Sequence, residues 1–317
     1  NSSTLLGTFF CKNLSSYSKS AGNYHFINRT ITSETICKTS CQNFSAFHAL
    51  YAKLEFSYSI PDNWLSWFVG FSEGDGAILS YNGRPLFVLT QKEELILQHI
   101  LSVLGFGTIR KIDKKGTIFY RYIVEDFTGV LLLALIFNGN LAIPNRVKQL
   151  DKWLSEINLK LSTKGSRIYG LCSTIVPSTC LFKPSLNNAW LSGFTDAEGC
   201  FNVNITKREN TLTGYRVILR YVLDQKYALD ELTYISSLFG YGKVIIRSTD
   251  MYRYYCNSII GLVNVCNYFK SFPLKTKKSN SLANWLKVYK MVLNKEHLTT
   301  EGLEMIRVIK KTINPKN

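Results

Sequence analysis

The stretch WLSWFVGFSEGDG at positions 64–76 is an apolar segment that ends in two carboxylates set between glycines. Its apolar run predicts a helix, yet the last turn of a helix favours Lys or Arg, because its free carbonyl groups carry partial negative charge. A second stretch, AWLSGFTDAEGCF at 189–201, has the same arrangement. A single acidic residue before a glycine most often marks only a helix terminus. Two matching copies instead indicate that the carboxylates hold a cation.

The composition limits the class of protein. A chain of 317 residues with 46% hydrophobic and 13% aromatic residues is long enough for one or two well-filled domains and is not mainly disordered. Its 38 Lys and Arg against 22 Asp and Glu give a net charge of +16. This excess indicates a polyanionic partner, either nucleic acid or an anionic membrane surface. The longest apolar run, VLLLALIF at 130–137, is too short to span a bilayer, so we expect no membrane segment.

The chain contains an internal repeat. After the two acidic stretches, LTQKEELILQHILSVLGFG at 89–107 matches LDQKYALDELTYISSLFGYG at 223–242, and YRY at 120–122 matches YRY at 252–254. Recurrence of three segments in the same order predicts two related halves. We divide the chain into an N-terminal extension of unknown role at 1–60, a first half at 61–160, a linker at 161–185, and a second half with C-terminal helices at 186–317.

Each half has the same order of periodic segments. Helical spacing alternates with pairs of strand-like segments, and the Asn-Gly pair at 82–83 is a strong hairpin signal. The predicted fold class is α+β, with two pseudo-symmetric αββαββα halves. The predicted helices are 64–75, 92–104 and 127–137 in the first half and 189–198, 226–238 and 259–270 in the second, with further helices at 146–157 and within 280–313.

Small residues recur every four positions in the two acidic helices. Such a stripe allows two helix backbones to approach more closely than larger side chains would permit. We therefore expect the two helices to pack against each other as a pseudo-symmetric pair. The predicted interface residues are Ser66, Gly70 and Gly74 in the first helix and Ala189, Gly193 and Ala197 in the second.

The proposed packing brings Asp75 beside Glu198. Two carboxylates that lie close together repel each other and raise each other's pKa unless a positive charge lies between them. Hard divalent cations with oxygen ligands fit this arrangement, and Mg²⁺ fits it best because it commonly takes one or two carboxylates together with phosphates and waters. The sequence thus predicts Asp75 and Glu198 as metal ligands.

LSWFVGFSEGDG and LSGFTDAEG resemble the two motifs of a single-chain LAGLIDADG homing endonuclease, and the C-terminal NKEHLTTEGLEMIRVIKKTIN resembles the closing segment of fungal mitochondrial members. The resemblance covers about 60–317. It implies a saddle of two four-stranded antiparallel sheets on DNA, with the motif helices between them. The last acid of each motif, here Asp75 and Glu198, is implied to be catalytic and to bind the metals. The first copy has Asp where Glu is commoner, which leaves metal coordination possible.

The resemblance also implies roles for other charged residues. The earlier acids of the motifs, Glu73 and Asp196, are expected to cap a helix or to support the metal-binding acids. FPLKTKK at 272–278 resembles the family's basic segment near the cleaved phosphate, so Lys277 or Lys278 is expected to act in catalysis. Arg146 holds the corresponding place in the first half. Mg²⁺ is the implied cofactor with two or more ions, Mn²⁺ can substitute, and Ca²⁺ is expected to support binding without cleavage.

Alternation along the strands predicts the DNA-facing side chains. Residues two apart share a face of a sheet, and Arg pairs with guanine and Asn with adenine in the major groove. The first strand of the first half, AILSY, is poorly polar, so we expect it to contribute little. The predicted DNA-binding residues are Arg110, Arg121, Asn202, Asn204, Thr206, Arg216, Arg220, Lys243, Arg247 and Arg253.

The predicted function is site-specific cleavage of both strands of a long DNA target, by a monomer that contains an internal pseudo-dimer. The alternative is an intron-RNA maturase that assists group I intron splicing, alone or in addition to cleavage, because that class shares the fold and can retain both acids. A general RNA-binding protein would show stacking motifs that this sequence lacks. The resemblance further implies a mitochondrial location.

Overall fold

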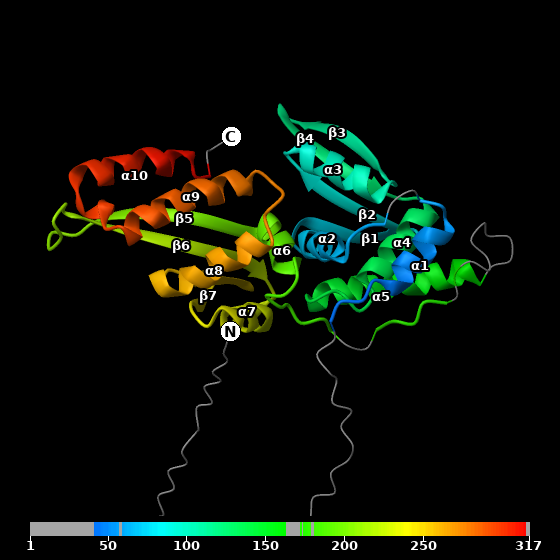
Figure 1. Cartoon of the computed structure of the whole chain (residues 1–317). Helices are drawn as coiled ribbons and strands as arrows, with labels where there is room; N and C mark the ends of the chain where they lie inside the picture. The colour runs from blue at the N-terminus through cyan, green and yellow to red at the C-terminus, as the bar shows by residue number, and fades with distance from the viewer. Residues whose placement is uncertain (1–40, 57–58, 163–171, 173, 179–180, 315–317) are drawn as a thin grey trace, which may run out of the picture. The chain divides into compact units, whose positions relative to one another are not determined.

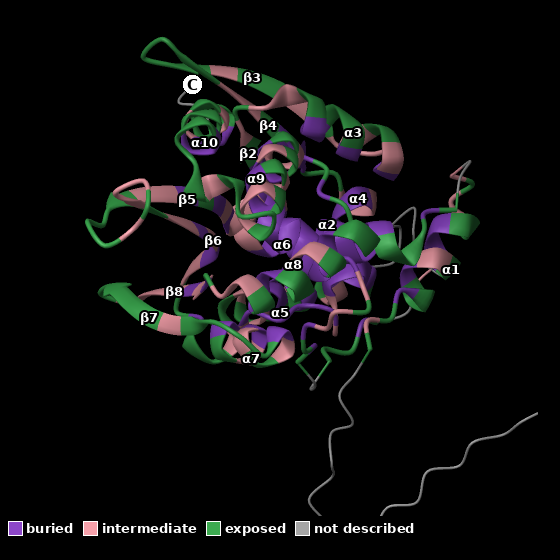
Figure 2. Cartoon of the chain, turned by 60° about the vertical axis from the view of Figure 1, so that its left-hand side comes forward, coloured by how far each residue is buried: buried purple, intermediate pink, exposed green. Residues whose placement is uncertain are grey.

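The two acidic motifs form helices that lie side by side, with one half of the molecule on each side of them (Figure 1). The computed structural model describes residues 41–56, 59–162, 172, 174–178 and 181–314. Helix α2 (Asp62–Asp75) carries the first motif and helix α6 (Trp190–Glu198) carries the second. Both helices are buried in the middle of the molecule, as Figure 2 shows. This central pair is the frame on which the candidate site is built.

The first half is a four-stranded antiparallel sheet covered by helices. Its strand order is β1-β2-β4-β3, so the two hairpins of the half pair through their second strands. The Asn82-Gly83 turn joins β1 and β2, with φ of 49° and 71°, which is the left-handed backbone that this hairpin turn requires. The elements after α2 are β1 (Gly76–Tyr81), β2 (Arg84–Gln91), α3 (Glu94–Leu104), β3 (Thr108–Lys114), β4 (Thr117–Val124), α4 (Phe127–Phe137) and α5 (Pro144–Leu161).

The second half repeats this plan with strand order β5-β6-β8-β7. The predicted fold, two αββαββα halves around a helix pair, is confirmed. Two further helices, α9 and α10, complete this half after α8, and α9 packs against β5. The elements after α6 are β5 (Gly199–Lys207), β6 (Tyr215–Lys226), α7 (Leu229–Phe239), β7 (Lys243–Ser248), β8 (Met251–Cys256), α8 (Ile259–Ser271), α9 (Lys278–Leu293), the 3₁₀ turn η1 (Glu296–Leu298) and α10 (Thr300–Thr312).

Part of the predicted extension belongs to the core of the first half. Helix α1 (Ser45–Lys53) packs against α4 and buries Phe47 and Leu50. Just before it, the backbone N–H of Asn43 donates to Asn140 Oδ1 at 2.8 Å, and Asn140 Nδ2 donates back to Asn43 O at 2.9 Å. The sequence predicted no role for this segment, because the extension as a whole is rich in Ser, Asn and Thr and its periodicity is weak. The earlier part of the extension, 1–40, lies outside the described residues.

The predicted linker is held on the first half by asparagine side chains. Asn158 donates to Ile175 O at 2.8 Å and accepts from the Ile175 N–H at 2.9 Å. Asn138 Nδ2 donates to Val176 O at 2.9 Å. Satisfying these backbone groups fixes the path of the described linker residues. In the described part of the chain, the structure contains no helix that is both long and apolar enough to cross a membrane.

Candidate active site

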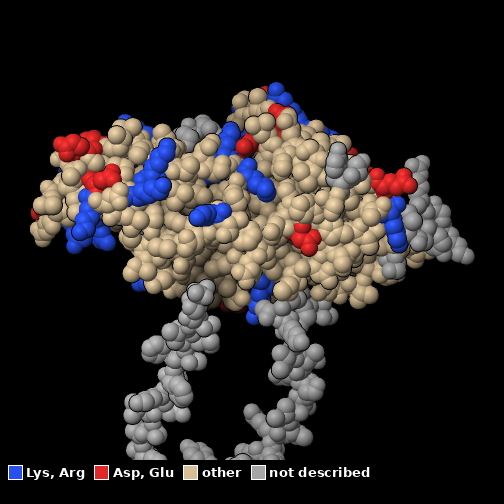
Figure 3. All heavy atoms as spheres, viewed as in Figure 1, with Lys and Arg blue, Asp and Glu red and all other residues tan. Residues whose placement is uncertain are grey.

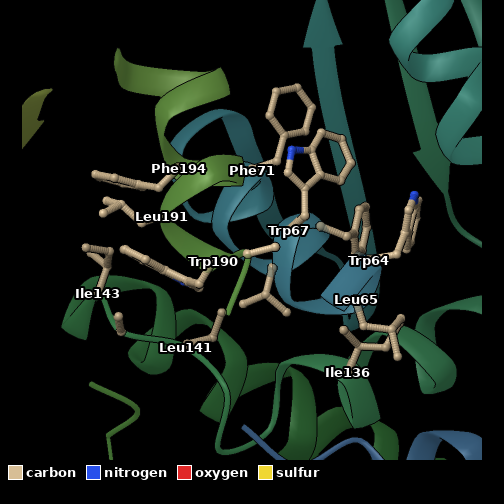
Figure 4. Packing of buried hydrophobic residues seen from close by; sticks show 14 of the residues in the cluster. Trp64, Leu65, Trp67, Phe71, Ile136, Leu141, Ile143, Trp190, Leu191 and Phe194 are labelled. Carbon is tan, nitrogen blue, oxygen red and sulfur yellow. The ribbon is translucent and has the colours of Figure 1, made fainter. Parts of the chain in front are cut away.

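Glycines set the distance between α2 and α6. A Cβ atom built on Gly70 would lie 2.0 Å from Trp190 O, and one built on Gly193 would lie 1.8 Å from Trp67 O. Neither distance is possible for real atoms, so only glycine permits this approach. Around the contact, Trp67 stacks on Phe71 with ring centroids 5.1 Å apart. Trp190 stacks on Phe194 at 4.9 Å in the same way (Figure 4).

The other small residues of the predicted stripes lie at the two ends of this contact. At the carboxyl ends of the helices, a Cβ on Gly74 would lie 2.3 Å from Ala197 Cβ and 3.1 Å from Glu198 Cγ. At the amino ends, Ala189 precedes α6 and is buried, while Ser66 donates to Gln42 Oε1 in the segment before α1. The closest approach therefore lies between these two ends, where Gly70 meets Trp190 and Gly193 meets Trp67.

Asp75 and Glu198 end the two helices at this meeting point, each followed by a glycine that begins a strand. Burial is the main cause that raises the pKa of Glu198 to about 7, and the Asp75 carboxylate adds to the rise. Burial also raises the pKa of Asp75, although a hydrogen bond from Gln91 Nε2 at 2.6 Å opposes the rise. The Asp75 carboxylate is thus near enough to raise the pKa of Glu198, and burial disfavours the ionised form of both acids.

The positive charge that neither helix carries in its own last turn is supplied by neighbouring helices. Arg146, in the first turn of α5, donates through Nε to Glu73 O at 3.0 Å and through Nη2 to Gly74 O at 3.3 Å. Lys278, at the start of α9, donates through Nζ to Thr195 O at 3.2 Å and to Ala197 O at 2.6 Å. These cations satisfy the terminal carbonyls and lower the pKa of both acids.

The arrangement fits a hard divalent cation. Among the described residues, no hydrogen bond or ion pair engages the Glu198 carboxylate, and one oxygen of Asp75 is likewise left free by the Gln91 bond. Arg146 and Lys278 bind backbone carbonyls rather than these carboxylates. Within the described part of the chain, His, Cys, Asp and Glu side chains form no group of three or more that could cage a metal. A metal here would complete its shell with phosphate and water, as Mg²⁺ commonly does.

The earlier acid of each motif is buried and accepts several hydrogen bonds. Glu73 Oε1 accepts from the Ala142 and Ile143 N–H groups at 2.8 and 2.6 Å, just before α5 begins. Asp196 accepts from the Lys275 and Thr276 N–H groups at 2.7 and 3.2 Å, just before α9 begins. Burial raises the pKa of Glu73 to about 7, while these donors oppose the rise. Each acid thus fixes the start of the helix that carries the basic residue.

The structure separates the two candidate lysines. Lys278 is half-buried with Nζ at the helix end, and burial lowers its pKa while the three nearby acids oppose that change. Lys277 is exposed, and its backbone N–H donates to Glu93 Oε2 of the first half at 3.0 Å. Only Lys278 therefore lies beside the paired carboxylates. The role of Gln91 was not predicted from the sequence, although Gln91 lies within the repeated segment LTQK, which matches LDQK in the second half.

The open face of the second sheet carries most of the predicted DNA-binding residues. Asn202 pairs across the strands with Arg220, and Thr206 with Arg216, while Phe201, Val203 and Leu219 point into the core. Lys243 lies opposite Tyr255 on the same face, and Asn204 lies opposite Ile218. A hollow of about 370 Å³ on this face is lined by Asn202, Arg220 and Arg253 among others. The alternation of faces follows the strand period of two.

Asp224 binds two of the arginines on this face, Arg247 and Arg253. The sequence did not predict this contact. The Asp224 carboxylate accepts from Arg253 Nε and Nη2, each at 2.6 Å, and from Arg247 Nη1 at 2.8 Å. The guanidinium groups lower the pKa of Asp224 below its ordinary value, against the effect of burial. The bidentate pair fixes the Arg253 side chain and uses two of the five N–H donors that it would otherwise offer to a ligand.

The open face of the first sheet differs in character. Arg110 and Arg121 lie directly opposite each other on neighbouring strands, an arrangement that costs energy unless an anion lies between them. Arg110 also forms an ion pair with Glu125 at 2.7 Å. The same face also carries Thr90, Thr108 and Lys114, together with apolar side chains such as Leu79, which is 44% exposed. Figure 3 shows separate Lys and Arg side chains, rather than one continuous basic surface, on the face turned to the viewer.

Known proteins are similar to this chain in sequence and in fold. Residues 191–289 match the family model described as LAGLIDADG endonuclease. Probable intron-encoded endonuclease 4 of Neurospora crassa is 37% identical over 263 residues, which are 81% of this chain and 46% of that protein. An uncharacterized 37.2 kDa protein of cox1 intron 2 in Schizosaccharomyces pombe is 26% identical over 75% of this chain and 69% of its own length. The chain thus spans about half the length of the Neurospora relative.

Solved structures match both halves. The LAGLIDADG meganuclease I-AabMI bound to uncleaved DNA has a TM-score of 0.62 and 24% identity, and the match covers 79% of this chain and 99% of that one. I-SmaMI bound to an uncleaved DNA target with calcium ions has a TM-score of 0.60 and 20% identity, over 80% and 99% of the two chains. Sequence and fold together confirm the resemblance to double-motif LAGLIDADG endonucleases that the two acidic motifs predict.

Proposed function

We propose that this chain is a site-specific DNA endonuclease that hydrolyses a phosphodiester bond on each strand of a long duplex target. The observation that carries the proposal is the pair of half-buried carboxylates, Asp75 and Glu198, at the touching ends of α2 and α6. Their free oxygens and the adjoining cations Arg146 and Lys278 form a centre suited to a phosphate and a divalent metal. The two structural relatives named above are, by their own descriptions, bound to uncleaved DNA.

Asp75 and Glu198 would hold Mg²⁺, with Mn²⁺ as a substitute. Such an ion, when bound, lowers the pKa of water and neutralises charge on the phosphate oxygens. The remaining work falls to the chain itself. The two carboxylates are half-buried between the helix pair and the start of each sheet, so bulk water is partly excluded from their unpaired oxygens.

The cations Arg146 and Lys278 would stabilise the negative charge that grows on the phosphate during hydrolysis. A lysine ammonium group has three donors, and two of them bind Thr195 O and Ala197 O, so one remains for a phosphate oxygen or the attacking water. Arg146 uses Nε and Nη2 on helix carbonyls and Nη1 on Gln149 Oε1, which leaves further N–H groups. Because these bonds fix both cations beforehand, little reorganisation is needed during the reaction.

The open faces of the two sheets would bind the DNA. The rows of Arg, Lys, Asn and Thr on β5, β6, β7 and β8 would contact base edges and phosphates, and the Arg110–Arg121 pair would bind a phosphate. The chain would act as a monomer, since both motifs are present in one chain. A mitochondrial location and assistance to intron-RNA splicing stay predictions of the sequence resemblance.

Selection of cleaved sites from a randomised duplex library with Mg²⁺ tests the proposal and supplies a substrate. On a selected duplex, Asp75→Asn and Glu198→Gln should each abolish double-strand cleavage, because each removes a charged metal ligand. Binding measured with Ca²⁺ should remain, since the sheets make the main contacts. Glu304→Gln, on the exposed side of α10, is the control and should cut normally. Cleavage retained by either acid variant would refute the proposed site.

A further inference from the structure

Two tryptophans link the halves through the buried acids. Trp67 of the first half donates from Nε1 to Asp196 Oδ2 of the second half at 2.9 Å. Trp190 of the second half donates from Nε1 to Glu73 Oε2 of the first half at 2.6 Å. Both indoles are fully buried, and each is the residue six positions before the acid of its own motif. The internal pseudo-symmetry therefore relates the two bonds to each other, and each bond joins one half to the other.

Each acid leads on to a basic residue of its own half. Asp196 also accepts from the Lys275 and Thr276 N–H groups, and Thr276 Oγ1 in turn accepts from the Lys278 N–H at 3.2 Å. The side chain of Lys278 then reaches the end of α6. Trp67 is fully buried and its Nε1 binds Asp196 rather than Lys278, yet its indole completes the set of donors that fixes the loop before Lys278.

The other chain of contacts runs the opposite way. Glu73 accepts from the Ala142 and Ile143 N–H groups, and Ile143 O accepts from the Arg146 N–H at 2.9 Å as α5 begins. Arg146 then binds the two carbonyls at the end of α2. Trp190 of the second half thus completes the donors around the acid that fixes Arg146 of the first half.

We infer that Trp67 and Trp190 are positioning residues, each of which fixes the basic residue of the opposite half through that half's buried carboxylate. Lys278 is held in place by the first half, and Arg146 is held in place by the second. Loss of one indole N–H should loosen one basic residue and leave the other in place. The effect on cleavage rests on the proposed function, whereas the linkage itself can be tested without DNA.

Hydrogen exchange of the free full-length chain tests the linkage. Trp67→Phe retains a ring in the core but removes the N–H group, so the Lys275 and Thr276 amides should exchange faster by on the order of tenfold, the effect of one hydrogen bond to a charged group. The Ala142 and Ile143 amides should be unchanged. Trp190→Phe should give the reverse pattern. Trp64→Phe is the matched control, because its indole donates at 2.9 Å to His99 within the first half, and it should alter neither pair of amides.

Strand-specific cleavage of a selected duplex, labelled on each strand, tests the consequence. Trp67→Phe should slow the cutting of one strand by about tenfold, so that nicked duplex accumulates, and Trp190→Phe should slow the other strand. Trp64→Phe should cut both strands at their normal rates. Duplex affinity should stay within about twofold in all three variants, since none of these indoles reaches the sheet faces.

The outcomes separate this inference from the proposed function. If wild-type protein cuts no duplex, the proposed function fails, and the exchange pattern still decides the linkage. If both Phe variants speed exchange at all four amides, or slow both strands equally, the indoles serve only general stability and the inference is overturned. No change in exchange in either variant also overturns it. Thermal unfolding identifies a variant that does not fold. In that case the exchange pattern of the other Phe variant tests the inference.

Discussion

The immediate surroundings of Asp75 and Glu198 differ, although the two acids hold equivalent places in the repeat. Asp75 accepts a hydrogen bond from Gln91, whereas Glu198 has Asp224 on its own sheet as a further negative neighbour. Asp224 is itself neutralised by Arg253 and Arg247, so its effect on Glu198 is limited. Burial and the carboxylates of Asp75 and Asp224 raise the pKa of Glu198 to about 7, so Glu198 is the member of the pair that we follow by its pH dependence.

We expect protons and metal to compete at this pair. The folded-state pKa of Glu198 is raised from its ordinary value of 4.5 to about 7, so the folded protein binds more protons than the unfolded chain between these values. Its contribution to stability is then present at low pH and is lost as the pH rises through about 7. Ca²⁺ relieves the repulsion, so the rise in Tm on adding Ca²⁺ should be larger at about pH 8 than at about pH 6.

Thermal unfolding with and without Ca²⁺ at both pH values measures this effect. Glu198→Gln should abolish most of the Ca²⁺ dependence, because the amide carries no charge at either pH. An equal rise in Tm at both pH values would show that the carboxylates do not hold the cation.

The two lysines of the 272–278 segment should separate in an activity assay. Lys278→Met keeps the aliphatic stem but removes the ammonium group at the end of α6, so kcat should fall by roughly a hundredfold, as when one fixed donor is lost from a catalytic centre. Lys277→Met is the control, because its side chain is exposed and only its backbone binds Glu93. Single-turnover cleavage of a selected duplex measures both, and equal losses would place the two lysines in one function.

At the scale of elements, the contact between α2 and α6 is set by backbone atoms and tolerates no added side-chain volume. Even alanine at Gly70 would bring a Cβ to 2.0 Å from Trp190 O, so the helices must separate. Because Asp75 and Glu198 terminate these helices, separation also changes the distance between the carboxylates. Helix packing and the proposed catalysis are thus coupled through two rigid helices that meet at the acidic residues.

Gly70→Ala and Gly193→Ala should therefore lower the cleavage rate strongly while the protein stays folded. Overpacking should cost about 1–3 kcal/mol in the free energy of unfolding. A shift of the metal ligands by about 1 Å should cost roughly a hundredfold in rate. Gly83→Asn is the control, because the hairpin turn has open space and Asn accepts its left-handed φ of 71°. A Gly193→Ala protein that folds and cuts at the normal rate would contradict the observed contact.

At the scale of the whole molecule, the net charge of +16 is spread over two sheets with different open faces. The second sheet offers several Arg, Lys and Asn side chains, while the first offers the Arg110–Arg121 pair, a few Thr side chains and more apolar side chains, such as Leu79. We expect the two halves of a DNA target to be bound unequally, with more polar contacts on the side of the second sheet. Apolar side chains in a groove can contact thymine methyl groups.

Binding should depend strongly on salt. Each phosphate neutralised by Lys or Arg contributes a slope of about −0.9 to log K against log salt concentration, and an interface over both sheets should neutralise several phosphates. Equilibrium binding of a selected duplex in Ca²⁺, measured across a salt series, gives this slope. Arg121→Gln should reduce its magnitude by about one, whereas Lys295→Gln in the loop before η1 should leave it unchanged. A nearly flat plot would show that the net charge does not bind DNA phosphates and contributes only to solubility.

The sequence by itself determined the elements and the repeat. Apolar periodicity, the Asn82-Gly83 turn and the paired acidic motifs are local patterns, so they predicted the helices, the hairpins and the two halves, including the meeting of α2 and α6 at their glycines. The four-residue spacing of Gly70 and Gly74 carried the packing information, because a helix places residues four apart on one face. The segment around Phe47, which packs on α4, was missed because its periodicity is weak.

Only the tertiary structure decided which side chains meet across long distances. The choice of Lys278 over Lys277 and the three bonds to Asp224 depend on how distant segments of the second half fold together. The bond from Trp67 to Asp196 depends on how one half is rotated against the other. No local sequence pattern encodes these contacts. Two neighbouring lysines look alike in a sequence, although their side chains lie in different surroundings in the folded protein. Backbone contact at Gly70 and Gly193 fixes the rotation, and the bonds of Trp67 and Trp190 to the acids of the opposite half and the meeting of Asp75 with Glu198 follow from it.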